Sequence, residues 1–294
     1  MWTRGKTLGS GGFGFVSIAT TRGHNSHLPA VVAVKSADIS HSKSLSMEKE
    51  LLHKFKSCPC ILRCFGDQIT TENGRNLYNI LLEYAPGGSL ADKIHSGKGI
   101  PEDIVSHHAK SIATALVHIH KIGYVHCDVK PHNVLLMGEH SKLADFGSCK
   151  KIGAAVQVFR GTVLYAAPES ISRLEYSAAA DVWALGCTVL NMLTGRAPWE
   201  IRKDATVTDV LMMIGVSDEI PEIPNVFSEE AKDFLRKCFV KDPAARCRAE
   251  SLLRHPFLKM ADRHGHGHGH HLHLSSKLHS LLPQCFHVPK IHVH

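Results

Sequence analysis

The fold is decided by the stretch Tyr124-Val-His-Cys-Asp-Val-Lys-Pro-His-Asn133 of this 294-residue chain. It places Asp128 two residues before Lys130 and five residues before Asn133, and Asp145-Phe-Gly147 begins twelve residues after that amide. This order suits phosphoryl transfer, because one acid can accept a hydroxyl proton while the amide and the second acid hold Mg²⁺ on a nucleotide. The stretch therefore predicts that the rest of the chain brings ATP and a hydroxyl substrate to this loop.

The composition is that of an ordinary globular protein, with 44% hydrophobic and 21% charged residues. The chain is long enough to bury a sizeable core in two lobes. Its net charge of +7 is spread without a dense Lys/Arg block, so we expect binding to neither nucleic acid nor membranes. Nine cysteines at irregular spacing indicate reduced thiols and a cytoplasmic or nuclear protein.

Glycines are concentrated in the N-terminal stretch Leu8-Gly-Ser-Gly-Gly-Phe-Gly-Phe-Val16. They let the backbone approach phosphates, but this pattern alone is also typical of a flexible hairpin. The residues that follow are β-type, whereas a dinucleotide-binding fingerprint would continue into a helix. Next comes Val31-Val-Ala-Val-Lys35, a short apolar strand that ends in a cation. A lysine at this distance favours phosphate binding over the bare hairpin.

An acid that pairs with Lys35 is expected on the short helix predicted for residues 44–55. Glu48 and Glu50 are both candidates, and at least one of them must be a solvated surface acid. Further on, residues 77–84 predict a buried strand that runs into a Pro-Gly-Gly connection. This connection is a good candidate for a hinge between two lobes.

Two further helices are predicted in the second half of the chain. Residues 104–121 repeat apolar side chains every three or four positions, and the four histidines there are expected to be surface or core residues. Residues 181–193 are apolar nearly all round, which indicates burial in the core of a large lobe. Short strands at 134–137 and 142–144 are expected to deliver Asp145 to the catalytic stretch.

Two cysteine- and histidine-rich segments invite a metal interpretation. Cys58-Pro-Cys60 has no second Cys pair or His cluster at ligand spacing, so we expect a packed loop. Residues 261–294 hold ten of the 23 histidines in low-complexity sequence, which predicts a disordered tail. Such a tract can hold Zn²⁺, Ni²⁺ or Cu²⁺, although adventitious affinity without function is the expectation.

Residues 3 to about 260 resemble the eukaryotic protein kinase family. The chain contains G-x-G-x-x-G-x-V, V-A-V-K, H-x-D-x-K-x-x-N, D-F-G, A-P-E and D-x-W-x-x-G in the order of that family. The catalytic motif, with Gly161-Thr162 before Ala167-Pro-Glu169, is similar to that of Ser/Thr kinases. Trp2-Thr-Arg-Gly5, the stretch Leu82-Glu-Tyr-Ala-Pro-Gly-Gly88 and the His-Cys-Asp-Val-Lys loop further resemble plant MAP kinase kinase kinases of the MEKK-like group.

The resemblance implies an α+β, bilobal protein kinase fold. A small, mainly-β N-lobe with one key helix would occupy residues 1–85, and a larger, mainly-α C-lobe residues 86–260. The implied activity is transfer of the ATP γ-phosphate, with Mg²⁺, to Ser or Thr of a MAP kinase kinase by a monomeric kinase domain. A pseudokinase scaffold and a metal-responsive regulator working through the tail remain as alternatives.

The resemblance also assigns roles to residues. Asp128 would accept the substrate proton, Lys130 would steady the γ-phosphate, and Lys35 would position the nucleotide while clamped by Glu48, which the family pattern favours over Glu50. Glu169 would form a structural ion pair with Arg246, and Asn133 and Asp145 would hold Mg²⁺. The residues implied around the nucleotide are Leu8, Gly9, Ser10, Gly11, Gly12, Phe13, Gly14, Val16, Ala33, Lys35, Leu82, Glu83, Ala85, Asn133, Leu135 and Asp145.

One position departs from the family pattern. Cys127 stands where most kinases have the arginine that clamps a phosphorylated activation loop, and a thiol cannot do this. Between Gly147 and Gly161 the only hydroxyl is that of Ser148. We therefore predict that activity does not need phosphorylation within residues 149–161.

Overall fold

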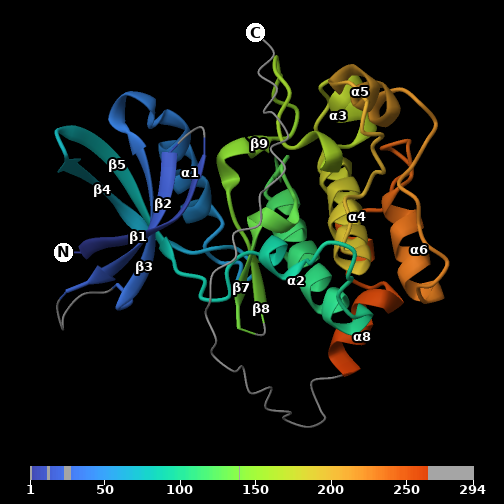
Figure 1. The fold of residues 1–294 in the computed structure, drawn as a ribbon, viewed down its shortest axis with the longest axis horizontal. Helices are drawn as coiled ribbons and strands as arrows, with labels where there is room; N and C mark the ends of the chain where they lie inside the picture. The colour runs from blue at the N-terminus through green and yellow to red at the C-terminus, as the bar shows by residue number, and fades with distance from the viewer. Residues whose placement is uncertain (1, 12–13, 23–27, 139, 264–294) are drawn as a thin grey trace.

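The computed structural model describes residues 2–11, 14–22, 28–138 and 140–263, which form a sheet-rich part and a larger helical part (Figure 1). A five-stranded antiparallel sheet of order β1-β2-β3-β5-β4 builds the first part, together with helix α1 (Lys43–Lys54). Its strands are β1 (Trp2–Gly11), β2 (Gly14–Thr21), β3 (Val31–Asp38), β4 (Cys64–Glu72) and β5 (Arg75–Glu83). The predicted two-lobed α+β fold is confirmed.

The alternation of β3 determines where its lysine lies. Successive side chains of a strand point to opposite faces, so Lys35 shares a face with Ala33 and Ala37, which belong to the main core beside α1. Val32 and Val34 point the other way and pack in a small separate cluster. In the sheet register Lys35 lies opposite Ile80 of β5, in the middle of the sheet.

The helical part is organised around α4, which is buried along almost its whole length. This helix starts at Ala178, three residues before the predicted start at Asp181, because the Ser177 hydroxyl accepts the Ala179 N–H (3.2 Å) and caps it. It ends at Thr194, one residue after the predicted end, with Gly195 as its C-cap. The helices of this part are α2 (Glu102–Lys121), α3 (Pro168–Ser172), α4 (Ala178–Thr194), α5 (Val207–Gly215), α6 (Glu229–Cys238), α7 (Ala249–Leu252) and α8 (Pro256–Arg263).

Two small ribbons connect the parts. Strand β8 lies one to two residues earlier than predicted, because Met137 pairs with His140 at the end of the ribbon. The strands are β6 (Tyr124–Val125), β7 (Val134–Met137), β8 (His140–Leu143) and β9 (Lys150–Lys151). Single 3₁₀ turns lie at Ile39–His41, Leu90–Lys93, Pro131–Asn133, Phe146–Ser148 and Val163–Tyr165.

The predicted tail falls mostly outside the described residues. We expected it to start at residue 261, but α8 continues to Arg263, and residues 264–294 are not described. Cys58 is buried and Cys60 half-buried in the turn after α1, and both thiols are free. Within the described part of the chain, no three His, Cys, Asp or Glu side chains form a potential metal site. None of the helices described is both long and apolar enough to cross a membrane.

Candidate active site

Lys35 joins the two parts of the molecule through two carboxylates. Its Nζ lies 2.6 Å from Oε2 of Glu48 on α1 and 2.9 Å from Oδ1 of Asp145 in the helical part. Glu48 is 2% exposed and lies one helical turn before buried Leu52, whereas the side chain of Glu50 is 69% exposed. Of the two acids that the sequence left open, the structure brings Glu48 to Lys35.

Burial and attraction between opposite charges shift the pKa values of Lys35, Glu48 and Asp145 in opposite directions. Burial alone would lower the pKa of Lys35, but attraction to Glu48 and Asp145 outweighs it and raises the pKa above its ordinary value. Burial raises the pKa of Glu48 despite the lysine. For Asp145, burial favours the neutral acid, but the charge and hydrogen bond of Lys35 prevail and lower the pKa. Lys35 and Asp145 are therefore both charged near neutral pH.

The carboxylate of Asp128 is surrounded by donors from two segments. Lys130 Nζ lies 2.9 Å from Oδ2, and Asn133 Nδ2 donates to the same oxygen at 3.1 Å. The Thr162 hydroxyl donates to Oδ1 at 2.7 Å and itself accepts from Lys130 (2.6 Å). Gly161 makes this approach possible, because a Cβ there would lie 2.2 Å from a backbone oxygen of the catalytic stretch.

Asp181 at the start of α4 holds the backbone of the catalytic stretch. It is 1% exposed and accepts the N–H groups of His126 (2.8 Å) and Cys127 (2.9 Å). His120, at the end of α2, contacts the same carboxylate through Nε2 at 2.9 Å. From the sequence alone we expect no ligand role for His120 and no role for Asp181. A buried acid needs hydrogen-bonding or charged partners. An acid within an apolar helix was therefore the sequence signal that could have revealed the role of Asp181.

His126 and Phe146 pack together beneath the site. The imidazole Nε2 lies 3.1 Å from the Ala144 carbonyl, while Nδ1 accepts the Asp128 N–H (3.3 Å), so the proton belongs on Nε2. The Phe146 ring lies 4.8 Å from this imidazole and 5.4 Å from Phe55 after α1. With Phe146 buried inside, the preceding aspartate turns toward Lys35.

Comparison with known proteins agrees with this geometry. A model of the protein kinase domain matches residues 2–258. The chain belongs to the protein kinase family. Over 266 residues it is 47% identical to mitogen-activated protein kinase kinase kinase 20 of Arabidopsis thaliana, covering 87% of this chain and 78% of the relative. Identity to kinase kinase kinase 18 of the same plant is 40% over 267 residues, covering 87% and 77%.

This kinase is therefore a protein serine/threonine kinase, similar to plant MAP kinase kinase kinases. Number 17 of the same series in Arabidopsis thaliana is 39% identical, with 87% of this chain and 69% of the relative covered. Protein kinases generally use ATP and Mg²⁺. The acid, lysine and amide of the described site are those on which family chemistry depends, so nothing here favours a pseudokinase scaffold.

Fourteen of the sixteen predicted nucleotide-lining residues fall in the described part of the chain. Gly12 and Phe13 lie outside the described residues. The backbone N–H of Glu83 donates to the Arg63 carbonyl (2.9 Å), and the Glu83 side chain pairs with Lys142 (2.7 Å). The described residues of the predicted set lie on β1, β2, β3, β5 and β7, in the connection after β5, and in the two motifs: Leu8, Gly9, Ser10, Gly11, Gly14, Val16, Ala33, Lys35, Leu82, Glu83, Ala85, Asn133, Leu135 and Asp145.

Tyr176 bonds both backbone groups of one residue in the activation segment of this kinase. The backbone N–H of Arg160 donates to the Tyr176 phenol oxygen (2.6 Å), and the phenol donates to the Arg160 carbonyl (3.1 Å). Burial raises the pKa of Tyr176 to about 12, so the phenol keeps its proton. Burial also raises the pKa of the Cys127 thiol, which leaves it neutral and unable to attract a phosphate.

A buried ion pair supports the same segment from below. Glu169 accepts Arg246 in a bidentate arrangement, with oxygen–nitrogen distances of 2.7 and 3.0 Å. Both side chains are buried, so each charge needs the other as its counter-charge. The pairing is the structural one that the sequence predicted.

Proposed function

We propose that this kinase works at the MAP kinase kinase kinase level, transferring the ATP γ-phosphate to Ser or Thr of a MAP kinase kinase. The names of its relatives supply the substrate class. The observation that carries the chemistry is the pair of clusters at Asp128 and Lys35. One cluster can accept a substrate proton, and the other can hold a nucleotide.

Asp128 has one place left for a substrate hydroxyl. An ionised carboxylate offers about four lone pairs. Lys130 and Asn133 occupy two on Oδ2, and Thr162 occupies one on Oδ1. The remaining lone pair of Oδ1 would accept the hydroxyl proton and orient its oxygen, and Lys130 would counter charge that develops on the transferred group.

The acids and amides of the site fit a nucleotide-bound Mg²⁺. Asp145 is ionised, and Asn133 uses its amide nitrogen to bind the Asp128 carbonyl (2.8 Å), which leaves its amide oxygen as a ligand. Hard oxygen donors are what Mg²⁺ prefers. When bound, the ion would neutralise phosphate charge. Lys35 would then hold the α- and β-phosphates, with Glu48 fixing its ammonium.

Adenine would bind against the connection after β5. The N–H of Ala85 makes no hydrogen bond within the described part of the chain, and its carbonyl accepts the Gly88 N–H (3.2 Å). This leaves the Ala85 N–H as a donor for the base. Leu82 is buried and would form the back wall of the pocket.

The test is a transfer assay with ATP, Mg²⁺ and a MAP kinase kinase, using a short Ser/Thr peptide as a second substrate. We expect phosphate on Ser or Thr, and a loss of about 10³-fold in kcat with Asp128→Asn. Asp92→Asn is the matched control, because Asp92 only caps a surface turn. Transfer no faster than that of Asp128→Asn on either substrate would refute the proposal.

We also propose that activity is independent of phosphorylation in residues 149–161. Support comes from the Tyr176 contacts and from the absence of hydroxyl side chains in that segment of the sequence. Mass mapping of the active enzyme and assay after phosphatase treatment would test it, and activity lost with a phosphosite there would contradict it.

Free thiols at all eight described cysteines accord with a cytoplasmic or nuclear location, which fluorescent tagging would check.

A further inference from the structure

Two free thiols lie close together in the turn that follows α1. Cys58 and Cys60 are two positions apart, and the Ile61 N–H donates to the Cys58 carbonyl (3.2 Å), which closes a turn around Pro59. Two residues span at most about 7 Å, and closing the turn brings the two Cα atoms within the separation that a disulfide allows. The Cys60 thiol already donates a hydrogen bond to the Cys58 sulfur.

The Cys58 sulfur is surrounded by groups that favour its thiolate. Besides the Cys60 thiol, the backbone N–H groups of Cys60 and Ile61 donate to it, and Lys142 on β8 contributes positive charge. The hydrogen bond from Cys60 does most to lower the pKa of the Cys58 thiol to about 7, although burial opposes it. The same bond raises the pKa of Cys60. Near neutral pH the pair therefore combines a nucleophilic thiolate with a neighbouring thiol that keeps its proton.

This pair differs from the other described cysteines in its reactivity. Cys58 is 5% exposed, but Cys60 is half-buried, so solvent reaches the pair from the side of Cys60. Burial raises the pKa of five of the other six described thiols, which keeps them protonated and unreactive. Oxidation is therefore expected in the turn after α1 before it occurs elsewhere in the described chain.

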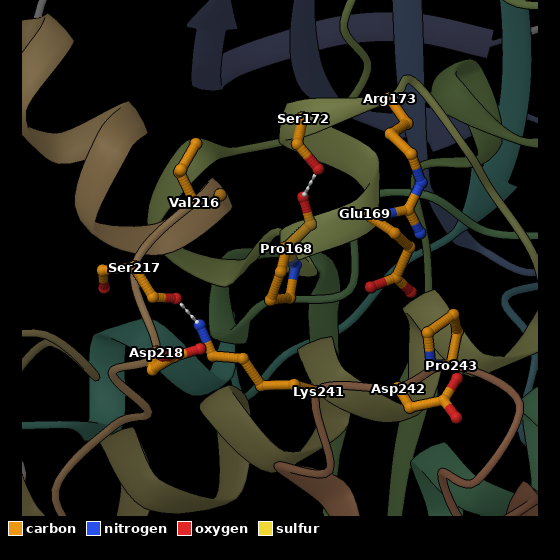
Figure 2. Close-up of a pocket in the computed structure, with 11 residues that line it drawn as sticks. Pro168, Glu169, Ser172, Arg173, Val216, Ser217, Asp218, Lys241, Asp242 and Pro243 are labelled. Atoms are coloured by element: carbon orange, nitrogen blue, oxygen red, sulfur yellow. Dashed lines mark hydrogen bonds between the residues drawn. The ribbon is translucent and has the colours of Figure 1, made fainter.

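No comparable group lines the cavity of about 290 Å³ between α3 and the end of α5 (Figure 2). None of the 11 residues around it is a cysteine or a histidine. Lys241 donates to the Ser217 carbonyl, and the Ser172 hydroxyl donates to the Pro168 carbonyl (2.9 Å), as Figure 2 shows. These donors are engaged within the chain, so the reactive groups that catalysis leaves unused are the two thiols.

The turn is connected to both acids that hold Lys35. It follows α1, which carries Glu48, and its Cys60 carbonyl accepts the N–H of Leu143, two residues before Asp145 (2.8 Å). The Leu143 carbonyl accepts an N–H of the same loop in return (2.9 Å). A covalent bond draws two sulfurs closer than a hydrogen bond does, so a disulfide would tighten the turn and shift these backbone contacts.

We propose that Cys58 and Cys60 form a reversible disulfide when this kinase is exposed to hydrogen peroxide, and that the disulfide lowers its activity. The Cys58 thiolate attacks one peroxide oxygen, the O–O bond breaks, and the departing hydroxide takes up a proton to become water. Cys58, oxidised by two electrons, is then a sulfenic acid. The Cys60 sulfur attacks the Cys58 sulfur, the S–S bond forms, the S–O bond breaks, and hydroxide leaves as a second water with the Cys60 proton. Two thiols and one peroxide thus give one disulfide and two waters.

Mass mapping tests the site without relying on kinase activity. Trypsin cuts after Lys56 and Arg63, so residues 57–63 form one peptide that holds both thiols and no other cysteine. After peroxide and maleimide labelling, we expect this peptide unlabelled and lighter by two hydrogen atoms, and dithiothreitol before labelling should reverse the change. Cys60→Ser should leave a sulfenic acid at Cys58 that dimedone traps, because the serine hydroxyl can still donate to that sulfur.

The activity readout is steady-state transfer to a short Ser/Thr peptide. Peroxide should lower kcat/KM of the wild type about tenfold, because small displacements of Glu48 and Asp145 disturb the geometry around Lys35. Dithiothreitol should restore the rate, and Cys58→Ser should keep its activity in peroxide. Cys64→Ser is the matched control and should be inhibited like the wild type, since half-buried Cys64 donates to a carbonyl of its own strand (3.6 Å).

The outcomes are distinguishable. A 57–63 peptide that stays fully labelled at a peroxide dose that oxidises glutathione completely would overturn the site, and so would a disulfide that joins this peptide to Cys64. With the disulfide formed, a kcat/KM within twofold of the untreated wild type would overturn the inhibition, as would an equal loss in Cys58→Ser. The mass result holds even for an enzyme without transfer activity, so failure of the proposed function is told apart from failure of the site.

Discussion

Replacing Tyr176 by Phe removes one oxygen atom that holds the activation segment. Tyr176 is 7% exposed, and its phenol oxygen bonds both the N–H and the C=O of Arg160, at 2.6 and 3.1 Å. The benzyl ring fills the same space, so packing is kept. The two backbone groups lose their partners, and an unsatisfied buried polar group costs about 1–3 kcal/mol.

The lower end of that range applies, because Arg160 is only half-buried and water can reach it. Two groups at about 1 kcal/mol each give about 2 kcal/mol. This raises the ratio of disordered to ordered activation segment roughly 30-fold. We therefore expect kcat/KM for a MAP kinase kinase to fall by about 10- to 30-fold. KM for ATP should not change, because neither Tyr176 nor Arg160 contacts Lys35, Glu48 or Asp145 among the described residues.

The assay is steady-state transfer from ATP, with protein substrate and ATP varied in turn. Tyr78→Phe is the matched control, since it also loses a buried phenol bond, to Asp67 at 2.8 Å, but on β5. A Tyr176→Phe enzyme with kcat/KM within twofold of wild type would show that the phenol does not hold the segment. A loss of activity equal to that of Tyr78→Phe would lead to the same conclusion.

Three further predictions concern single residues. Glu48→Gln should lower kcat/KM about 100-fold and Glu50→Gln by less than twofold in the same assay, because only Glu48 contacts Lys35; similar losses would contradict the pairing. Burial beside another imidazole lowers the pKa of His108 from 6.5 to about 4, so the unfolded chain binds a proton that the folded chain does not. The free energy of unfolding should thus fall by about 3 kcal/mol as pH drops from about 6.5 to 4, and a urea titration of His108→Leu should show a shallower pH dependence. Glu169→Ala leaves Arg246 buried without a counter-charge and should cost about 3–5 kcal/mol in urea unfolding, whereas a loss below 1 kcal/mol would contradict this.

The sequence predicted elements whose evidence is local. The glycine loop, the strand that carries Lys35 and the apolar α4 helix all follow from spacing and periodicity, although that strand continues to Asp38. The errors lie at helix boundaries, because a capping residue determines where a helix begins. The Ser177 cap places the start of α4 three residues before the predicted start. The roles of the catalytic residues came from the resemblance, because spacing alone did not choose between Glu48 and Glu50.

What could not be predicted depends on partners that are distant in the chain. Asp181 serves the catalytic stretch from 55 residues away, and nothing near it in the sequence indicates that backbone N–H groups are its partners. The Glu83 N–H is occupied by a carbonyl from the loop before β4. The exposed side of α5 could not be predicted either. Its sequence is apolar on every side, and only the fold shows which residues are left uncovered.

The contact between Tyr176 and Arg160 has a consequence for how long signalling by this kinase lasts. A phosphoester is added by one enzyme and removed by another, so a switch of that kind can be reset while the protein persists. The phenol contact, by contrast, needs no second enzyme to make or to remove it. We therefore expect the duration of signalling by this kinase to follow its synthesis and degradation, with no phosphatase able to shorten it at this segment.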